Sequence, residues 1–335
     1  MASLRTEITE IATGLGAMGV PSVAEALDGP LRPELRNVGE QRWERLRLAH
    51  AAREHEGEFL AAFNNGRALL RADDGLRGRA PLLVEWKGSH RDPADDAVPA
   101  DLRIDHVYLV SCKYLSKVLH NASPWALFDR CLSGPSGLRG GDWFDEVAPA
   151  EHQAHYQAVR RLLEGPERLP ESVGGLDAAQ RRRLAEARDL GSPDTAAAYA
   201  ALADAVARRS AARWQEHLGT AREQRSMLWR LLRLSATPYF VLGTGRGESL
   251  RLRVATPWDW NQAWELRAFE VAAEPGGQPR VGWRATVRSR ADGEEAEVDG
   301  HVEIRWSHGR LGGSPEAKVY LDTPHRRVPG YVELR

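Results

Sequence analysis

Two carboxylates and a lysine lie close together between residues 71 and 88. Asp74 stands just before a turn glycine, and Glu85 and Lys87 follow the apolar run Pro81–Val84. Residues two apart in a strand point to the same face, so Glu85 and Lys87 are expected side by side. Carboxylates bind a hard ion such as Mg²⁺ or Mn²⁺, and an ammonium group offsets charge on a phosphate. The pattern predicts a metal site that could activate water for phosphodiester hydrolysis.

The order Asp74-Gly-Leu, apolar strand, Glu85-x-Lys87 resembles the core motif of the PD-(D/E)XK nuclease superfamily, and within it the lambda-type exonucleases. Asp73 stands where that family often has proline. The resemblance implies a restriction-endonuclease-like mixed sheet, with Asp74 and Glu85 as metal ligands and Lys87 assisting the water. Nucleases of this superfamily often take a further metal ligand from the helix before the sheet. By resemblance that ligand is Glu58, although a glutamate on a helix rich in them is more often simply solvated.

A second segment carries the same residue types. Asp101 or Asp105, followed by Ser111-Cys-Lys113, resembles the superfamily variant in which serine replaces the middle acid. Lys113 is then the catalytic lysine, Asp105 a metal ligand, and Glu85 an acid supplied from elsewhere. Adjacent strands could bring Glu85, Asp105 and Lys113 together, so the two interpretations are compatible. The first interpretation is preferred because its own segment contains both acids, whereas the second needs Glu85 from another segment.

The motif is short, and a third match lies near the end of the chain. Asp299 followed by Glu316-Ala-Lys318 fits the same loose pattern but lacks an Asp-Gly-Leu context, so it ranks lower. Lysine occurs only at positions 87, 113, 117 and 318 among 46 basic residues. In a chain that uses arginine so heavily, a lysine is expected where a compact ammonium is needed. Lys87 lies in the first of the two segments described above, and Lys113 lies in the second.

The fold class expected from the patterning is an α/β N-terminal domain, a helical middle and a β-rich C-terminal domain. The expected divisions are a helical segment over 1–40, a nuclease-like core over 41–140, a helical region over 141–235 and an antiparallel β domain over 236–335. Helical spacing predicts one helix over 41–63, and a strand is expected over Arg67–Arg71. The Gly-rich segment Gly134–Gly141 is expected to mark a domain boundary.

Capping residues predict a helix over about 149–164 and a long helix from Ser192-Pro-Asp194 that Gly219 splits. Turn residues then separate six expected strands, Tyr239–Leu242, Leu250–Val254, Trp264–Phe269, Val281–Val287, Val302–Trp306 and Val319–Leu321. The tryptophans at 258, 260, 264, 283 and 306 fall in this region. They are either the aromatic core of a small β domain or a platform on which unpaired bases stack.

Composition limits the function classes. A net charge of −1 gives no global basic field, so a nucleic-acid surface must be a local arginine patch. The two cysteines build neither a disulfide framework nor a metal cluster, and no leader or membrane-spanning run is evident, so a cytoplasmic protein is expected.

The expected function is a Mg²⁺- or Mn²⁺-dependent deoxyribonuclease, as a defence or restriction-type component, acting alone, as a homodimer or with a protein partner. The alternative is a non-catalytic nucleic-acid-binding or assembly subunit that uses the helical arm and the tryptophan-rich β domain.

Overall fold

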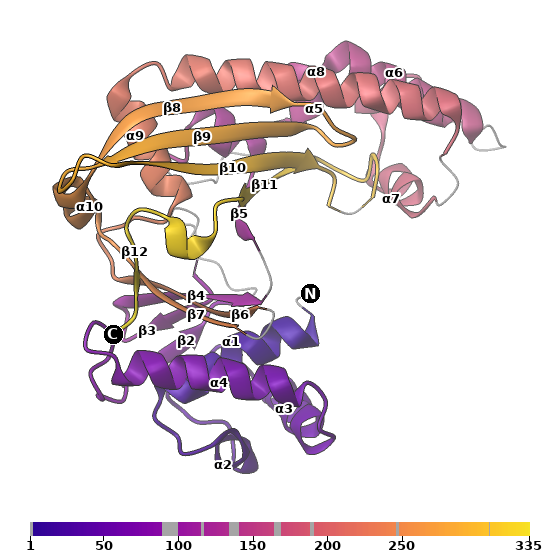
Figure 1. Ribbon diagram of the computed structural model, residues 1–335. Coiled ribbons are helices and arrows are strands. Elements are labelled where there is room, and N and C mark those ends of the chain that lie inside the picture. Colours follow the sequence, from indigo (N-terminus) through magenta and orange to yellow (C-terminus); the bar gives the residue numbers. More distant parts are fainter. Residues whose placement is uncertain are drawn as a thin grey trace. The chain divides into compact units, whose positions relative to one another are not determined.

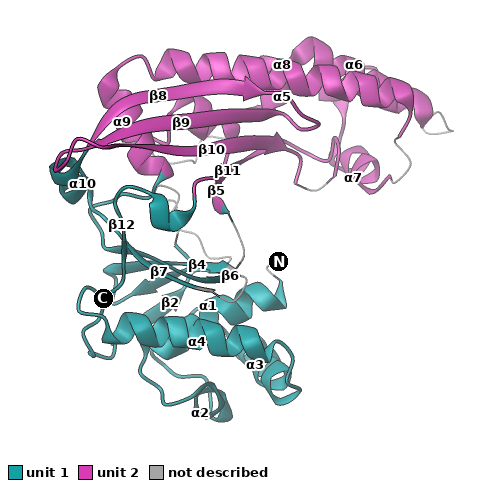
Figure 2. Ribbon diagram, viewed as in Figure 1, with its two compact units in different colours: residues 1–117, 232–264, 324–335 teal, residues 118–231, 265–323 magenta. Residues whose placement is uncertain are grey.

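The structure is a computed structural model of the chain (Figure 1). It describes residues 3–88, 100–114, 117–133, 141–163, 169–187, 191–245, 248–307 and 309–335. The chain forms two compact units (Figure 2). Unit 1 comprises residues 1–117, 232–264 and 324–335, and unit 2 comprises residues 118–231 and 265–323.

These units differ from the four consecutive segments expected from the sequence. The first transition between units falls after Lys117, and the segment 134–140, where a boundary was expected, lies outside the described residues. The strands expected over 236–335 form, but they are shared between two sheets instead of building one β domain. The reason is long-range strand pairing, which local sequence patterns do not encode.

Unit 1 is built on a mixed sheet whose described strands lie in the order β1-β2-β3-β4-β6-β7-β12. The strands are β1 (Leu35–Arg36), β2 (Val84–Trp86), β3 (Leu102–Ile104), β4 (Tyr108–Tyr114), β6 (Tyr239–Gly245), β7 (Glu248–Val254) and β12 (Tyr331–Glu333). β2, β3 and β4 form an antiparallel meander, and β4 is parallel to β6. A mixed sheet combined with helices confirms the α/β class expected for the N-terminal part.

Helices α1 (Leu4–Ala17) and α4 (Glu56–Arg71) cover one face of this sheet (Figure 1). The other helices of unit 1 are α2 (Val23–Asp28), α3 (Glu40–Ala51) and α10 (Pro257–Ala263). The single helix expected over 41–63 is therefore two helices, separated by a turn in which Arg53 and His55 have positive φ. The strand expected over Arg67–Arg71 is wrong. The segment is the last turn of α4, whose buried positions Phe59, Phe63 and Leu69 continue the helical period.

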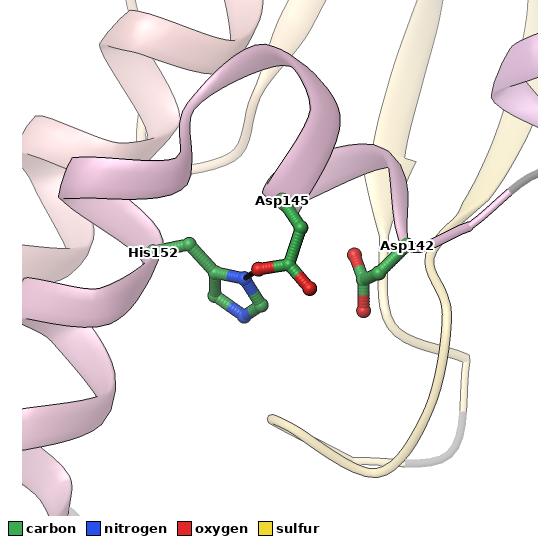
Figure 3. A group of neighbouring side chains, drawn as sticks. All are labelled: Asp142, Asp145 and His152. Carbon is green, nitrogen blue, oxygen red and sulfur yellow. Dashed lines mark hydrogen bonds and ion pairs between the residues drawn. The ribbon is translucent and has the colours of Figure 1, made fainter. Parts of the chain in front are cut away.

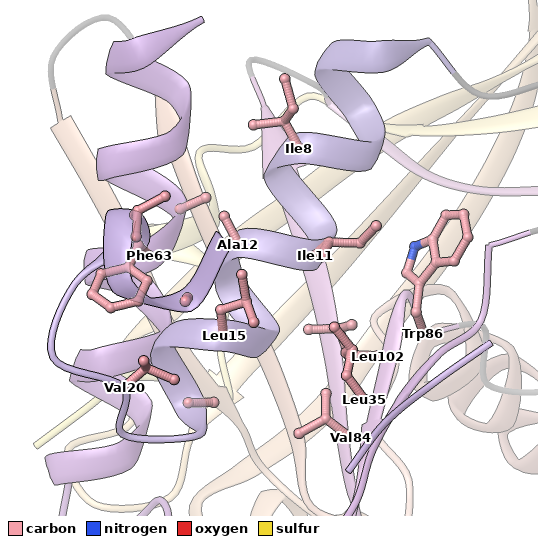
Figure 4. Packing of buried hydrophobic residues seen from close by; sticks show 14 of the residues in the cluster. Ile8, Ile11, Ala12, Leu15, Val20, Leu35, Phe63, Val84, Trp86 and Leu102 are labelled. Atoms are coloured by element: carbon pink, nitrogen blue, oxygen red, sulfur yellow. The ribbon is translucent and has the colours of Figure 1, made fainter. Parts of the chain in front are cut away.

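Two glycines let α1 and α4 approach closely. A Cβ on Gly66 of α4 would overlap the carbonyl oxygen of Thr13, and a Cβ on Gly16 of α1 would overlap that of Phe63. The side chains around this contact form the core of unit 1, in which Ile8, Leu15, Val84 and Trp86 are at most 1% exposed (Figure 4). The face of the sheet that α1 covers is therefore apolar and tightly packed.

Unit 2 is built on an antiparallel sheet of described strands in the order β5-β11-β10-β9-β8. The strands are β5 (Val118–Ala122), β8 (Trp264–Glu274), β9 (Arg280–Ser289), β10 (Glu295–Arg305) and β11 (Glu316–Leu321). Its helices are α5 (Trp143–Val147), α6 (Pro149–Leu162), α7 (Ala178–Glu186), α8 (Pro193–His217) and α9 (Ala221–Leu231), with a π-helical turn over Trp125–Asp129.

The helical predictions for unit 2 are largely confirmed. Ser192 caps α8 through a capping box, and Gly219 lies in the break between α8 and α9. Helix α8 packs on the sheet, where Trp214 meets Phe269 edge to face at 6.2 Å. The tryptophans do not form one exposed platform: Trp260 and Trp283 are at most 2% exposed, in unit 1 and unit 2 respectively. Among the described residues, no helix is both long and apolar enough to cross a membrane.

We expect Gly66→Ala to lower the free energy of unfolding by about 2 kcal/mol, because overpacking costs about 1–3 kcal/mol and exceeds the gain in helix propensity. Gly57→Ala is the matched control in the same helix. Gly57 is exposed and a Cβ there meets no atom within 4 Å, so the change should raise stability by about 0.5–1 kcal/mol. Urea denaturation of both variants measures the difference, and equal stabilities would contradict the close helix contact.

Candidate active site

The sheet of unit 1 has a polar face, which we define as the face opposite α1. Val84, Trp86 and Leu102 point into the core beneath α1 (Figure 4), and Val110 belongs to the same buried cluster. Side chains alternate across a strand, so the residues between these core positions point to the polar face. They are Glu85 of β2, Asp101 and Arg103 at β3, and Ser111 and Lys113 of β4. The segment with Glu85 and the segment from Asp101 to Lys113 therefore both contribute residues to the same face of one sheet.

Asp101 is the centre of one group on the polar face. The register that pairs Leu102 with Val110 places Asp101 opposite Ser111, and the Asp101 N–H donates to the Val110 carbonyl oxygen at 2.9 Å. Asp101 Oδ2 accepts hydrogen bonds from the Ser111 hydroxyl at 3.3 Å and from the Cys112 N–H at 2.6 Å. The carboxylate is thus fixed across the strand pair that carries the Ser-x-Lys motif.

Lys113 is the next residue of β4 on the polar face after Ser111. Burial lowers the pKa of its ammonium, Arg233 lowers it further, and the negative charges of Asp101 and Glu10 partly restore it. Lys113 pairs with Gly243 of the parallel strand β6, where a Cβ would lie 3.0 Å from the Lys113 Cβ. Glycine therefore leaves the flank of Lys113 free of a β6 side chain.

Glu10 of α1 is a buried acid on the other side of the sheet that sequence analysis missed, and its charge acts on Lys113. Its side chain is nearly buried, and Glu10 Oε2 accepts a hydrogen bond from the Trp86 Nε1–H at 2.5 Å. With Asp101 it acts on Cys112, whose pKa is raised well above the usual thiol value, mainly by burial. The sequence signal was a glutamate among the apolar residues of an N-terminal helix, about 90 residues before Asp101.

Two further residues of unit 1 border the group. Arg233 is 4% exposed and has a positive φ of 63°, and its charge acts on both Lys113 and Tyr239. Burial raises the pKa of Tyr239 to about 12, against a smaller opposing effect of its hydrogen bond with Ser111. Cationic, anionic and hydroxyl groups are therefore concentrated around Ser111 and Lys113 in a largely desolvated region.

Glu85 belongs to a different part of the polar face. Its carboxylate accepts two hydrogen bonds from the Arg103 guanidinium, at 2.7 and 3.0 Å, and lies 3.1 Å from His106 Nδ1. The hydrogen bonds from Arg103 are the main cause of its lowered pKa. Arg103 lies opposite Leu109, four residues before Lys113, which is about 14 Å along the strand. The expectation that Glu85 supplies an acid beside Lys113 therefore finds no support in the register.

Asp74 and Glu58 have partners outside the polar face. Asp74 lies in the turn after α4, where its Oδ1 accepts a hydrogen bond from the Arg335 N–H at 3.1 Å. Glu58, near the start of α4, forms an ion pair with Arg5 at 3.0 Å and approaches His55 Nδ1 at 3.5 Å. Each carboxylate thus has local electrostatic partners that account for its position.

Asp105 stabilises a turn, whereas Lys87 lies next to Asp101. Asp105 has a positive φ of 49°, and its Oδ1 accepts hydrogen bonds from the N–H groups of Leu82 and Leu83 at 2.8 and 3.0 Å. It stabilises a turn, and Asp101 is the aspartate that lies against the Ser-x-Lys motif. Lys87 is 5% exposed, and its N–H donates to the Asp101 carbonyl oxygen at 2.9 Å. The lysines of the two sequence motifs, Lys87 and Lys113, therefore both lie near Asp101.

The third match to the motif lies in unit 2. The register pairs Lys318 of β11 with Glu303 of β10, four residues from Asp299 and therefore about 14 Å along the strand. The Asp299 carboxylate accepts a hydrogen bond from Thr323, and that of Glu316 accepts one from Ser307. Asp299 is thus far along the sheet from the Glu316 and Lys318 pair.

We expect Glu85→Gln to lower the free energy of unfolding at pH 7 by about 1 kcal/mol, since both partners of the Arg103 ion pair keep some contact with solvent. A lowered pKa in the folded state adds stability above the pKa of the unfolded chain, and this stability is lost as pH falls through the folded value. The difference from the parent protein should therefore shrink under acid conditions. Urea denaturation at several pH values measures it, with the exposed turn residue Glu54 changed to Gln as control. A pH-independent difference would contradict the ion pair.

The chain matches no family model, no curated protein and no solved structure. Its function is therefore inferred from the chemistry of the polar face.

Proposed function

We propose that unit 1 is a metal-dependent nuclease whose active centre contains Asp101, Ser111 and Lys113. The observation that carries this proposal is the Asp101 carboxylate, held by Ser111 and Cys112 on the strand that presents Lys113 on the same face. The meander β2-β3-β4 with parallel β6 supports a restriction-endonuclease-like sheet. The resemblance of the Asp101 and Ser111-Cys-Lys113 segment to the PD-(D/E)XK superfamily supports DNA as the substrate.

The donor set fits a hard divalent ion such as Mg²⁺ or Mn²⁺. Among the described residues, Asp101 uses only Oδ2 for hydrogen bonds, so its Oδ1 is available as a ligand. Glu10 is a further, nearly buried carboxylate whose negative charge acts on Lys113 from the α1 side of the sheet. Oxygen donors of this kind are those that Mg²⁺ and Mn²⁺ prefer. With Asp101 as a ligand, the ion would supply a bound water of lowered pKa and positive charge near the phosphate.

The chain's own residues would then have separate roles in the reaction. The Lys113 ammonium would bind a phosphate oxygen and orient the attacking water, since a compact point donor suits a confined site. Arg233 and Lys87 would add positive charge that attracts the phosphodiester backbone. Ser111 would keep the Asp101 carboxylate oriented through its hydrogen bond. Partial burial strengthens each of these interactions, because the local dielectric constant is lower than in water.

The proposal predicts that the full chain cleaves DNA in Mg²⁺ or Mn²⁺ and not in EDTA. Asp101→Asn and Lys113→Met should each lower the rate at least about 100-fold, because the first removes the charge of a metal ligand and the second removes the ammonium aimed at the reacting phosphate. Cleavage of supercoiled plasmid, labelled linear duplex and RNA of the same length measures the rate and the substrate class. Circular dichroism and thermal unfolding of each variant separate loss of chemistry from loss of folding.

Glu85→Gln is the control that shows which of the two sequence motifs forms the active site. It removes a charge from the same face of the sheet but leaves the Asp101 group unchanged, so cleavage should stay near that of the parent protein. The reverse result, with Glu85 essential and Lys113 dispensable, would place the site at Asp74, Glu85 and Lys87. If the parent protein binds DNA but never cleaves it under any metal condition, the non-catalytic binding subunit is the correct function.

A further inference from the structure

Unit 2 contains a group of ligand-type side chains separate from the proposed nuclease centre. Asp142 precedes α5, Asp145 lies in its first turn, and His152 lies on α6. One potential ligand atom from each residue lies within 4.8 Å of the other two. Figure 3 shows the nitrogen-bearing edge of the His152 ring facing Asp145, with the Asp142 carboxylate beyond it on the same side. Three donors from two successive helices thus converge on one point.

The group leaves buried polar atoms unsatisfied. The His152 side chain is 0% exposed, and its Nδ1 lies 2.7 Å from Asp145 Oδ1. Its Nε2 is buried and has no hydrogen-bond partner among the described residues. Asp142 uses Oδ1 to cap α5 by accepting from the Phe144 N–H at 2.9 Å, while its buried Oδ2 also has no partner there. Buried polar atoms are almost always paired, so two orphans in one group indicate a missing ligand.

The electrostatics of the group also favour a bound cation. Potential ligand oxygens of Asp142 and Asp145 lie within 4.8 Å of each other, and His152 is fully buried beside them. Two carboxylates in a poorly solvated region repel each other unless a positive charge lies between them. A divalent ion would provide that charge at the point where the three side chains converge.

The surroundings would hold the histidine in place. The Phe144 ring contacts His152 edge to face at 5.6 Å, and the Trp306 ring lies 5.9 Å from it. Phe144 and Trp306 themselves pack at 4.7 Å and 90°. An aromatic wall of this kind restricts rotation of the imidazole and limits the access of water. The ligands are therefore preorganised before any ion binds.

We propose that Asp142, Asp145 and His152 bind a first-row divalent transition-metal ion, with Zn²⁺ as the representative of the class. One imidazole nitrogen and two carboxylate oxygens are donors that Zn²⁺ accepts, whereas Mg²⁺ prefers oxygen donors and retained water. Three protein ligands leave at least one position for water or another molecule. The ion would join the start of α5 to α6 and stabilise unit 2.

The test is titration of the EDTA-treated full chain with Zn²⁺, followed by calorimetry and by thermal unfolding. We expect a saturable site whose occupation raises Tm. Asp142→Asn keeps a good N-cap but removes the charge, and should weaken Zn²⁺ binding at least about tenfold, as should Asp145→Asn. Asp177→Asn is the matched control, because Asp177 caps α7 in the same unit through the same type of hydrogen bond. It should bind Zn²⁺ like the parent protein.

Two outcomes would overturn the proposal. One is the absence of Zn²⁺ binding by the parent protein, and the other is unchanged affinity in both Asp142→Asn and Asp145→Asn. The Asp101→Asn protein separates this site from the nuclease centre, since it should lose cleavage and keep the Zn²⁺-dependent rise in Tm. Co²⁺ in place of Zn²⁺ gives an independent readout, because its visible absorption reports a nitrogen and oxygen ligand set that the aspartate variants should alter.

Discussion

The register between β3 and β4 is the constraint on which the chemistry of unit 1 depends. It pairs Leu102 with Val110 in the core and thereby sets Asp101 opposite Ser111 on the other face. A shift of β3 by one residue would move Asp101 into the apolar core and Leu102 out of it, so burial of the core selects the register. The hydrogen bond from the Cys112 N–H to Asp101 then locks the carboxylate to the neighbouring strand. Core packing and the geometry of the polar face are thus two results of one strand pairing.

The packing of α1 on the sheet has a similar double effect. Gly16 and Gly66 allow α1 and α4 to pack with their backbones in close contact. This contact holds α1 against the strands, and it brings Glu10 within hydrogen-bonding distance of Trp86 at the end of β2. A helix that lay farther from the sheet would leave this carboxylate in solvent. Gly16 and Gly66 therefore help to position a buried acid against Trp86.

Local patterns in the sequence predict the helices and strands well where caps and periodicity agree, as for α6, α8 and the strands after residue 236. These local patterns do not predict contacts between residues that are far apart in the sequence. The Asp-Gly-Leu turn drew attention to Asp74 and Glu85, yet the partners of these residues, Arg335 and Arg103, are fixed only by tertiary structure. Asp101 was recognised as an alternative to Asp105, but the choice required the strand register. Glu10 and the Asp142 group carry no sequence motif, because single acids within helices and near helix starts are common.

The interleaving of the two units has a consequence for how the protein is made. Strand β4 ends at Tyr114 and its parallel partner β6 begins at Tyr239, so a chain emerging from the ribosome cannot pair them until the whole of residues 118–231 has been synthesised. Strand β5 must wait in the same way for β11. During this interval the edges of β4 and β5 lack their final partners, and such edges attract other chains. Nascent chains of this protein should therefore depend on chaperones more than a protein of equal length with consecutive domains.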